Sequence, residues 1–445
     1  GVISQWFEVA KDGKRQFTQI RDFKGDAPVA LLTPEHFRKG FISAGSDGTI
    51  NFFHATGEAK LLGEKIDGGN LAAVAISPRH NLLLTQQGDD FKVFDVENDH
   101  PEVTWSALWQ QVWYEGYPEP QYVWQSTSAS NDFEAKLSLV PLVFGTLKAS
   151  FYAMVFAVPL GVAGAIYTAY FMSAGLRKYV KPTVEIMAAL PTVILGFLAG
   201  LWLAPIIEGA LPGVILLLIL LPMGMLLTAL VWNYLPERGR TWLPEGWHAI
   251  LLIPVLLFIG WGAFALSPII ENAFMHGDSR IWLTHDMGIK FDQRNSLVVG
   301  IAMGFAVIPT IFSIAEDAVF SVPKHLTQGS LALGATPWQT LSRVVILTAS
   351  PGIFSAVMMG LGRAVGETMI VLMATGNTPI MDFSMFQGLR TLAANIAVEM
   401  PESEVGSSHY RVLFLAAFVL FVFTFLFNTL AEFVRQRLRE KYSSL

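Results

Sequence analysis

Long runs without a charged side chain constrain this chain more than any other feature. A helix needs about 20 mostly apolar residues to cross the hydrocarbon of a bilayer, and only helices or closed barrels satisfy their backbone polar groups there. Six runs of that length contain no Asp, Glu, Lys or Arg, and a seventh is apolar except for Arg363 and Glu367. We therefore predict a mainly α, polytopic membrane protein with seven spans. The runs are 149–176, 186–207, 209–236, 249–270, 295–315, 412–431 and the charge-bearing 344–374.

The charged residues are concentrated in the N-terminal third. The chain has 30 basic and 36 acidic side chains, and 32 of these 66 lie within residues 1–148. That third therefore has the composition of a water-soluble domain, whereas the rest does not. The net charge of −6 and the lack of a basic cluster argue against nucleic-acid binding. Because the chain has 0 cysteines, disulfides and thiol chemistry are excluded.

The loops between the runs differ in charge. Short loops rich in Lys and Arg stay on the cytoplasmic side of a membrane. If every span crosses once, the basic loops fall on one side and the acidic or mixed loops on the other. We therefore expect residues 1–141 outside the membrane, and the segment 316–346 and the C-terminus in the cytoplasm. The basic segments are 172–184, 236–247 and the tail after residue 431, and the others are 271–294 and 375–411.

Two segments of the N-terminal third repeat one another. Residues 41–58 align with 82–99 without gaps at an offset of 41. Alternating strands at a period of about 40–45 residues are typical of β-propeller blades. The likeness to WD40-like blades is partial, because Phe53-His54 and Phe94-Asp95 stand where those blades have Trp-Asp.

Too few repeats are present to close a ring of at least about four blades. Residues 1–101 are therefore expected to form part of an all-β, propeller-like domain, with earlier blades upstream of Gly1. A small sheet of four to six strands is the alternative. His54 and His80 stand alone in the sequence, so no metal site is predicted.

The linker 102–141 is rich in Trp and Tyr, which suit the headgroup zone of a membrane. We expect an interfacial helix there, with a helix of a soluble core as the alternative.

The segment 316–346 is a polar, helix-forming excursion between two apolar runs. A stretch of about 25 residues is more than a plain connection needs. Gly334 lies at its centre and lets two short helices turn against each other. We predict a cytoplasmic helical hairpin.

This hairpin resembles the coupling loop, called the EAA loop, of ATP-binding-cassette importer permeases. Gly334 takes the position of the Gly in that loop, and Val344 follows ten residues later as the loop requires. Gln328 stands where the loop has its Glu, so a salt bridge to the ATPase is not expected, whereas docking depends on helix shape. The resemblance implies that coupling involves Glu316, Asp317, Gln328, Gly329, Ser330, Leu333, Gly334, Ala335 and Thr336.

Among these importers the chain resembles the Pst-type phosphate permeases, in particular the PstC-like subunit, over about 145–205 and 295–435. The resemblance implies a type I, MetI-like permease domain over 142–435, followed by a basic tail at 436–445. The spans within 209–270 have no counterpart that we recognise and form an added pair. The matching blocks, in order, are Val158–Gly161 with Ala165–Tyr167, Glu185 with Ala189–Val193 and Gly196-Phe197, Ile308–Thr310 with Glu316–Ala318 and Val322-Pro323, Gly362–Met369 with Gly376-Asn377, and Arg390–Leu392 with Ala394–Ala397.

Arg363 and Glu367 stand four residues apart and share one helix face. An Arg at the bilayer centre costs about 2.5–3.5 kcal/mol, so it is normally paired or faces a polar cavity. Its planar fork matches phosphate oxygens. The resemblance implies that this helix lines the substrate pathway, with Thr368 and Asn377 beside it. The alternative is an Arg–Glu pair that only holds helices together. Close helix packing is expected at Pro159, Gly161, Pro191, Gly196, Gly362 and Gly366.

The expected function is that of a non-catalytic permease subunit of an ATP-driven phosphate importer in the bacterial inner membrane. The chain has no GxxxxGK[ST] motif, so ATP and Mg would be bound by partner ATPases, and no cofactor is expected here. The expected partners are two ABC ATPase subunits, a periplasmic phosphate-binding protein, membrane lipid, and a second permease subunit, either a PstA-like paralogue or an identical chain. The alternatives are a permease for another oxyanion such as sulfate or molybdate, a membrane-anchored sensor, and an ion-coupled carrier.

Overall fold

A computed structural model describes the chain except for residues 12–13, 37, 68, 128–133, 235–250 and 443–445. The chain divides into two compact units. Unit 1 contains Gly1–Val143 and Val398–Ala417, and unit 2 contains Phe144–Ala397 and Phe418–Leu445. The predicted basic loop 236–247 lies outside the described residues.

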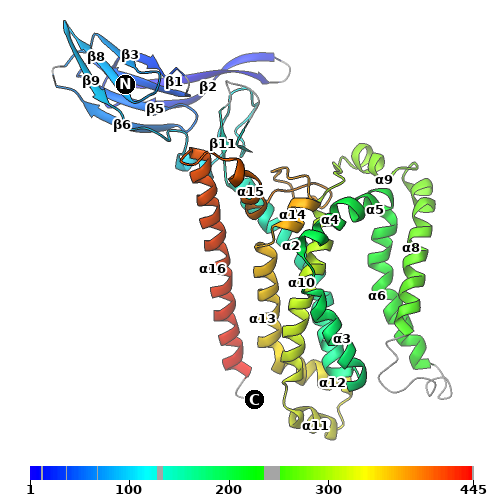
Figure 1. Ribbon diagram of the computed structural model, residues 1–445. Coiled ribbons are helices and arrows are strands. Elements are labelled where there is room, and N and C mark those ends of the chain that lie inside the picture. The colour runs from blue at the N-terminus through cyan, green and yellow to red at the C-terminus, as the bar shows by residue number, and fades with distance from the viewer. Residues whose placement is uncertain (12–13, 37, 68, 128–133, 235–250, 443–445) are drawn as a thin grey trace. The chain divides into compact units, whose positions relative to one another are not determined.

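Unit 1 contains antiparallel sheets (Figure 1). A long hairpin forms a sheet of its own, the next sheet has four strands in the order β3–β4–β5–β6, and the following one has three in the order β7–β8–β9. The described residues form open sheets and not a closed propeller. The strands are β1 Val2–Lys11, β2 Lys14–Lys24, β3 Val29–Pro34, β4 Gly40–Gly45, β5 Thr49–His54, β6 Ala59–Lys65, β7 Ala73–Ile76, β8 Leu82–Gln87 and β9 Asp90–Asp95.

The repeat seen in the sequence is present in the sheets, with a correction of one residue. The turn between β4 and β5 covers residues 46–48, whereas the turn between β8 and β9 covers only 88–89. Because Ala44 pairs with Ile50 and Gln86 pairs with Phe91, the offset is 41 in one strand of the hairpin and 42 in the other. The alignment without gaps is therefore wrong for one of the two strands, where it assigns every side chain to the opposite face.

The four-stranded and three-stranded sheets pack together through an apolar cluster. Ile50 and Phe52 are 2% and 6% exposed, and Leu83 of the next sheet is 4% exposed. Phe53 points to the other face of its strand and packs against Phe23 of β2. The alternation of the strands thus supplies apolar side chains to both faces of the four-stranded sheet.

Neither of the two histidines singled out in the sequence is isolated in space. Nδ1 of His54 accepts a hydrogen bond from the Gly57 N–H at 3.1 Å, and burial lowers the pKa of His54 to about 4. Nδ1 of His80 lies 3.9 Å from Oε2 of Glu35, and both side chains are buried. Burial raises the pKa of the Glu35 carboxyl. The described residues contain no group of three or more potential metal ligands.

The aromatic segment after the sheets is mostly not helical. Helix α1 covers only Trp105–Trp109, and Gly116, with φ 83°, and two prolines follow it. The prediction of an interfacial helix leading into the first span is therefore wrong: α1 ends at its C-cap Gln110, and the later prolines do not favour a helix. Short strands β10 (Trp124–Gln125) and β11 (Lys136–Leu137) pair further on.

One polar cluster joins the segment 398–417 to the rest of unit 1. Trp124 is 3% exposed, and its Nε1 donates to Oε1 of Glu399 at 3.1 Å. The other carboxylate oxygen of Glu399 lies 2.7 Å from Nε2 of His409. The end of one helix and the start of the last helix therefore belong to unit 1.

Seven helices of the described chain are long and apolar enough to cross a membrane, as predicted. The first span begins at Val140, nine residues before the predicted run 149–176. It includes Lys148, whose charge limits the predicted run but whose side chain is buried in the structure. The sixth ends at Val365, where the chain leaves the helix at Gly366. The seven are Val140–Phe171, Thr192–Gly209, Leu211–Trp232, Leu252–Phe274, Ser296–Phe320, Pro337–Val365 and Ser408–Arg437.

Several spans are assembled from α-helix and wider π-helical turns, which carry the letter η here. The 3-10 turn η6 has the same letter. The helical elements are α2 Val140–Ile166, η1 Tyr167–Phe171, α3 Ala174–Met187, α4 Thr192–Leu198, η2 Ala199–Leu203, α5 Ala204–Gly209, α6 Leu211–Tyr234, α8 Leu252–Phe274, α9 Ser279–Ile281, η4 Trp282–Asp286, α10 Ser296–Phe320, α11 Lys324–Ala332, α12 Pro337–Thr340, η5 Leu341–Val345, α13 Ile346–Val365, α14 Met369–Ala374, α15 Leu392–Glu399, η6 Met400–Glu402 and α16 Ser408–Tyr442.

Helix α10 is the centre of unit 2, and most of its residues are buried. It lies side by side with α13 and also contacts α3, α4 and α14 (Figure 1). Glycines permit this close packing. A Cβ on Gly300 would lie 2.9 Å from the Cβ of Tyr152 in α2, and one on Gly360 of α13 would lie 2.6 Å from Cγ1 of Ile311.

The two helices of the added span pair, α6 and α8, pack against each other at the edge of unit 2 (Figure 1). The N–H of Gly213 donates to Oγ of Ser267 at 3.1 Å. Gly224 leaves room for Ile259, whose Cδ1 lies 2.0 Å from the place of a Cβ there. The two helices are therefore fitted to each other.

Candidate translocation and coupling sites

Arg363 lies in the last turn of α13 and reaches across to α10. Its Nη1 donates a hydrogen bond to Oγ1 of Thr310 at 2.7 Å. Thr310 is the fifteenth of the 25 residues of α10, so the guanidinium lies near the middle of that helix. The Arg363 side chain is half-buried. Since a guanidinium has several N–H donors in a planar fork and this contact uses one, donors remain for a ligand.

Glu367 follows the end of α13 and contacts the start of the next helix. Its Oε1 accepts from the Ile370 N–H of α14 at 3.4 Å. Among the described side chains Glu367 and Arg363 form no ion pair, so the alternative of a mutual pair that holds helices together is not what the structure contains.

Thr368 and Asn377 lie at the two ends of α14. Oγ1 of Thr368 donates to the Gly366 carbonyl at 3.3 Å. Nδ2 of Asn377 donates to the Leu372 carbonyl at 3.0 Å from a position three residues beyond the end of α14, where its φ is 51°. Both side chains therefore make local contacts, one before α14 and the other after it.

The predicted hairpin is present as two helices joined by a tight turn. Gly334 has φ 89°, a conformation that glycine adopts without strain. The side chains of Thr336 and Gln339 each bond the other's backbone N–H, at 3.2 and 2.9 Å, and so cap α12. Oγ of Ser330 lies 2.9 Å from Oγ1 of Thr340 and joins the two helices.

The surface of the hairpin is open. Helix α11 has no buried residue, and Leu333 is 91% exposed at the turn. Trp338, at the start of α12, is 68% exposed. Gln328 and Gly329 are exposed, whereas Ala335 is half-buried. Large apolar side chains left in the open are typical of a protein contact surface.

Glu316 and Asp317 lie in α10 and bond α3. The Glu316 side chain is 0% exposed and pairs with Arg177 and with Nζ of Lys181, the latter at 2.8 Å. Lys181 also contacts Asp317 at 2.7 Å. Hydrogen bonds to Asp317 and Glu316 raise the pKa of Lys181. The guanidinium of Arg177 lies 3.7 Å from the ring centroid of Phe320. Glu316 is therefore an internal tie between α3 and α10 and has no exposed surface.

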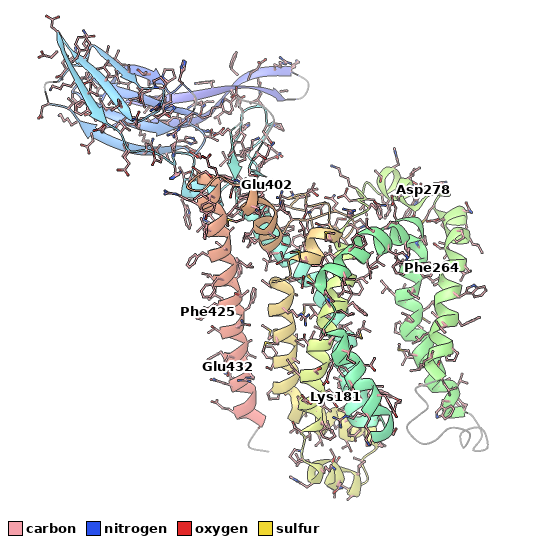
Figure 2. All side chains as sticks on the ribbon, viewed as in Figure 1. Lys181, Phe264, Asp278, Glu402, Phe425 and Glu432 are labelled. Carbon is pink, nitrogen blue, oxygen red and sulfur yellow. The ribbon has the colours of Figure 1, made fainter. Side chains whose placement is uncertain are left out.

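A second charged cluster lies at the other end of unit 2. Figure 2 shows Lys181 at the end of the helices that carries α11 and Asp278 at the opposite end. Arg280 contacts Asp278 at 3.0 Å and Glu208 at 2.6 Å. The Arg280 guanidinium holds the pKa of the Asp278 carboxyl below its usual range. The cluster joins the end of α5 to α9, on either side of the added span pair.

Two buried polar side chains were not among the predicted site residues. Lys148 in α2 is 2% exposed and its Nζ has no hydrogen-bond partner among the described residues. The carboxylates of Asp382 and Asp292 attract its ammonium group electrostatically. Asn395 in α15 is fully buried, with both amide atoms unbonded in the described part of the chain. Lys148 was missed because it stands one residue before the run 149–176.

Two of the predicted packing glycines make tight contacts. A Cβ on Gly161 would lie 2.9 Å from Cγ2 of Ile311, and one on Gly196 would lie 2.7 Å from the Met369 carbonyl oxygen. The other members of that set lie in looser surroundings. Gly362 and Gly366 would meet their nearest atoms at 3.3 and 3.7 Å, Pro159 lies exposed inside α2, and Pro191 precedes α4.

Seven candidate spans, with α10 packed against α13, α3, α4 and α14 and followed by an exposed helical hairpin, are the features of a membrane permease component. Residues 157–440 match the family described as the inner membrane component of binding-protein-dependent transport systems, and the chain belongs to this family of ATP-binding-cassette importer permeases. It is therefore a multi-pass inner membrane protein and a non-catalytic subunit. Such a subunit works with a binding protein and an ATPase.

Several relatives are similar over the same region. The chain is 27% identical over 307 residues to a probable ABC transporter permease protein, YqgH, of Bacillus subtilis, which covers 69% of this chain and 74% of the relative. It is 31% identical over 248 residues to the phosphate transport system permease protein PstC of Mesorhizobium japonicum, covering 53% and 73%. A solved inward-facing structure of the MetNI methionine transporter shares 15% identity at a TM-score of 0.35 and covers 67% of this chain and 94% of that chain.

Proposed function

We propose that this chain is a permease subunit of an importer for inorganic phosphate. The observation that carries the proposal is Arg363, which is half-buried and bonded near the middle of α10 to the neutral hydroxyl of Thr310. No carboxylate of the described residues pairs with this guanidinium, so its charge and its planar fork are left for an oxyanion. The similarity to relatives named as phosphate permeases supports the same substrate.

In the proposed mechanism, a binding protein releases phosphate on the side of the membrane opposite the hairpin. Two permease subunits enclose the pathway, and Arg363 in each holds the anion while it is out of water. Glu367 keeps the start of α14 in place, so that Thr368 and Asn377 stay beside the pathway. Two ATPase subunits dock on the hairpin at Leu333 and the neighbouring exposed side chains.

The cluster around Glu316 would carry motion from the hairpin into the spans. ATP-driven closure of the ATPases moves the hairpin. Because α10 leads directly to α11 and is tied to α3 by Arg177 and Lys181, both helices move with it. This coupling would alternate access to Arg363 between the two sides of the membrane.

The proposal places unit 1 on the outer side of a bacterial inner membrane. Residues 1–101 would be a propeller-like domain and 102–141 an aromatic linker. The permease domain would cover 142–435, with the hairpin at 316–346, and the tail 436–445 would lie in the cytoplasm. The contrast between basic and acidic loops supports this orientation.

Phosphate uptake by variants of Arg363 tests the pathway role. Loss of a hydrogen bond to a charged group costs about 1.5–3 kcal/mol, so Arg363→Gln should lower the initial rate by roughly ten- to hundredfold. Arg363→Lys should be intermediate, because Lys keeps the charge but loses the fork. The matched control is Arg343→Gln, which lies in the same span at its hairpin end, and co-purification of the ATPase reports assembly.

Two results would overturn the proposal in different ways. Uptake at the wild-type rate by an assembled Arg363→Gln transporter would remove Arg363 from the pathway. Uptake of sulfate or molybdate, but not of phosphate, by the unaltered transporter would keep the permease and replace the substrate.

A further inference from the structure

Among the described residues, the three-stranded sheet of unit 1 has one strand fewer than the four-stranded sheet that it repeats. Strand β5 pairs with β4 on one side and with β6 on the other. Strand β9 corresponds to β5 and pairs with β8, and no described strand lies on its other side. Its outer edge therefore carries unpaired backbone N–H and C=O groups, which are a template for another strand.

A cleft of about 710 Å³ lies beside this edge, between the two sheets. Phe52 and Leu62 line one wall, and Leu83 and Phe94 line the other. Phe52 pairs with Leu62, and Leu83 pairs with Phe94, so each wall is one face of one sheet. Leu62 of β6 is 38% exposed, and no described strand of the three-stranded sheet lies at the position facing it.

The rim of the cleft is more acidic than basic. Charged side chains surround the apolar walls, and a strand that entered with Lys or Arg near its ends would find opposite charges. The acidic members are Glu64, Asp67, Asp95 and Glu97, and the basic ones are Lys65 and Lys92.

We propose that β9 and this cleft form an acceptor site for an extended β-strand of a partner protein. The strand adds antiparallel to β9, as β6 adds to β5 within the chain. Alternate side chains of the strand are apolar and enter the cleft against Phe52 and Leu62. Backbone hydrogen bonds to the edge give affinity, and the cleft selects the side chains.

Photo-cross-linking from the two faces of β9 tests the site. Lys92 lines the cleft, whereas Val93 is 63% exposed on the opposite face of the same strand and is the matched control. Each is replaced by benzoylphenylalanine in the assembled transporter in its native membrane. We expect position 92 to cross-link to alternate residues of one segment of one partner, and position 93 not to. No cross-link from 92, or cross-links only to lipid, to another segment of the same chain or to residues 82–95 of a second copy, would overturn the proposal.

Thiol labelling gives a second measurement that does not need the partner's identity. The chain has 0 cysteines, so Lys92→Cys and Val93→Cys each create one reactive thiol. A strand that fills the site for nine tenths of the time would make maleimide labelling of position 92 about tenfold slower in native membranes than in the purified full chain. Position 93 should change by less than about twofold under the same test. Equal rates for position 92 in the two preparations would show that the cleft is empty in the membrane.

Discussion

Replacing Glu316 with Gln removes the charge at the centre of the tie between α3 and α10. Removing one partner of a buried ion pair costs about 3–5 kcal/mol, because the charge left behind stays buried without compensation. The side chains of Arg177 and Lys181 are 18% and 26% exposed, and Lys181 keeps its contact with Asp317. Water and Asp317 therefore offset part of the loss, and we expect the lower end, about 3 kcal/mol.

A double-mutant cycle separates the pair from the effects of each single change. The free energy of unfolding is measured by titration with SDS, followed by tryptophan fluorescence, for Glu316→Gln, Arg177→Gln and the double variant. Side chains in direct contact couple by about 0.5–3 kcal/mol, so the double variant should lose less than the two single changes together. The matched control is Asp317→Asn, whose side chain is 68% exposed and whose loss should cost less than about 1 kcal/mol.

Two outcomes would refute the reasoning. One is a Glu316→Gln variant within about 0.5 kcal/mol of the unaltered chain, which is the size of an ordinary surface substitution. The other is strict additivity of the two single changes, since independent sites add. Either result would mean that the cluster does not hold α3 to α10.

Three further predictions follow from contacts described above. Gly196→Ala places a Cβ 2.7 Å from the Met369 carbonyl oxygen and should cost about 1–3 kcal/mol in the same titration, whereas Gly209→Ala, with no atom within 4 Å, should change it by less than about 1 kcal/mol; equal effects would contradict the packing. Leu333→Asp should reduce co-purified ATPase about tenfold or more, and Lys324→Gln on the same hairpin should not; unchanged recovery would move the docking surface elsewhere. The pKa of His54 falls from 6.5 to about 4 on folding, so stability of unit 1 is full above 6.5 and is lost as the pH falls toward 4, by up to about 3 kcal/mol. His54→Asn keeps an acceptor for the Gly57 N–H and should flatten that slope in thermal unfolding, and parallel curves would exclude His54 as its source.

The existence of the spans could be read from the sequence because a bilayer forbids unpaired charge over a fixed length. Their ends could not. Lys148 is a charge that a boundary rule assigns to the interface, yet it is buried inside α2. The run that ends at residue 374 looks continuous in composition, but the chain leaves the helix at Gly366 and begins α14 at Met369. Tertiary packing decides both cases, and composition carries no trace of it.

The hairpin was predictable because its signal is local. The turn depends on the positive φ of Gly334, which glycine adopts without strain, and the polar residues before it form a helix with no buried residue. The partner of Arg363 was not predictable in this way. Thr310 lies 53 residues away, and only the packing of α13 on α10 brings the two together. The role of Glu316 was likewise hidden, because its partners Arg177 and Lys181 come from a different helix.

The sheet repeat shows the same limit at smaller scale. The offset of 41 fits only one of the two strands in each hairpin. The turn of the second hairpin is one residue shorter, and a single residue inverts the faces of a strand. The sequence alignment therefore located the strands correctly, but it did not show which side chains of each strand are buried.

The π-helical turns η1 and η5 have a consequence for motion at the hairpin end of unit 2. Leu341 and Val345 of η5 share an apolar cluster with Ala169 and Tyr170 of η1. A π turn holds one residue more than an α turn, and one residue of α-helix corresponds to about 100° of rotation. If η5 took up α geometry, the hairpin would turn by that angle about the axis of α13 while both helices stayed whole. On the proposed function, in which the hairpin docks the ATPase, such a change in η5 would turn the docking surface relative to the span without breaking either helix.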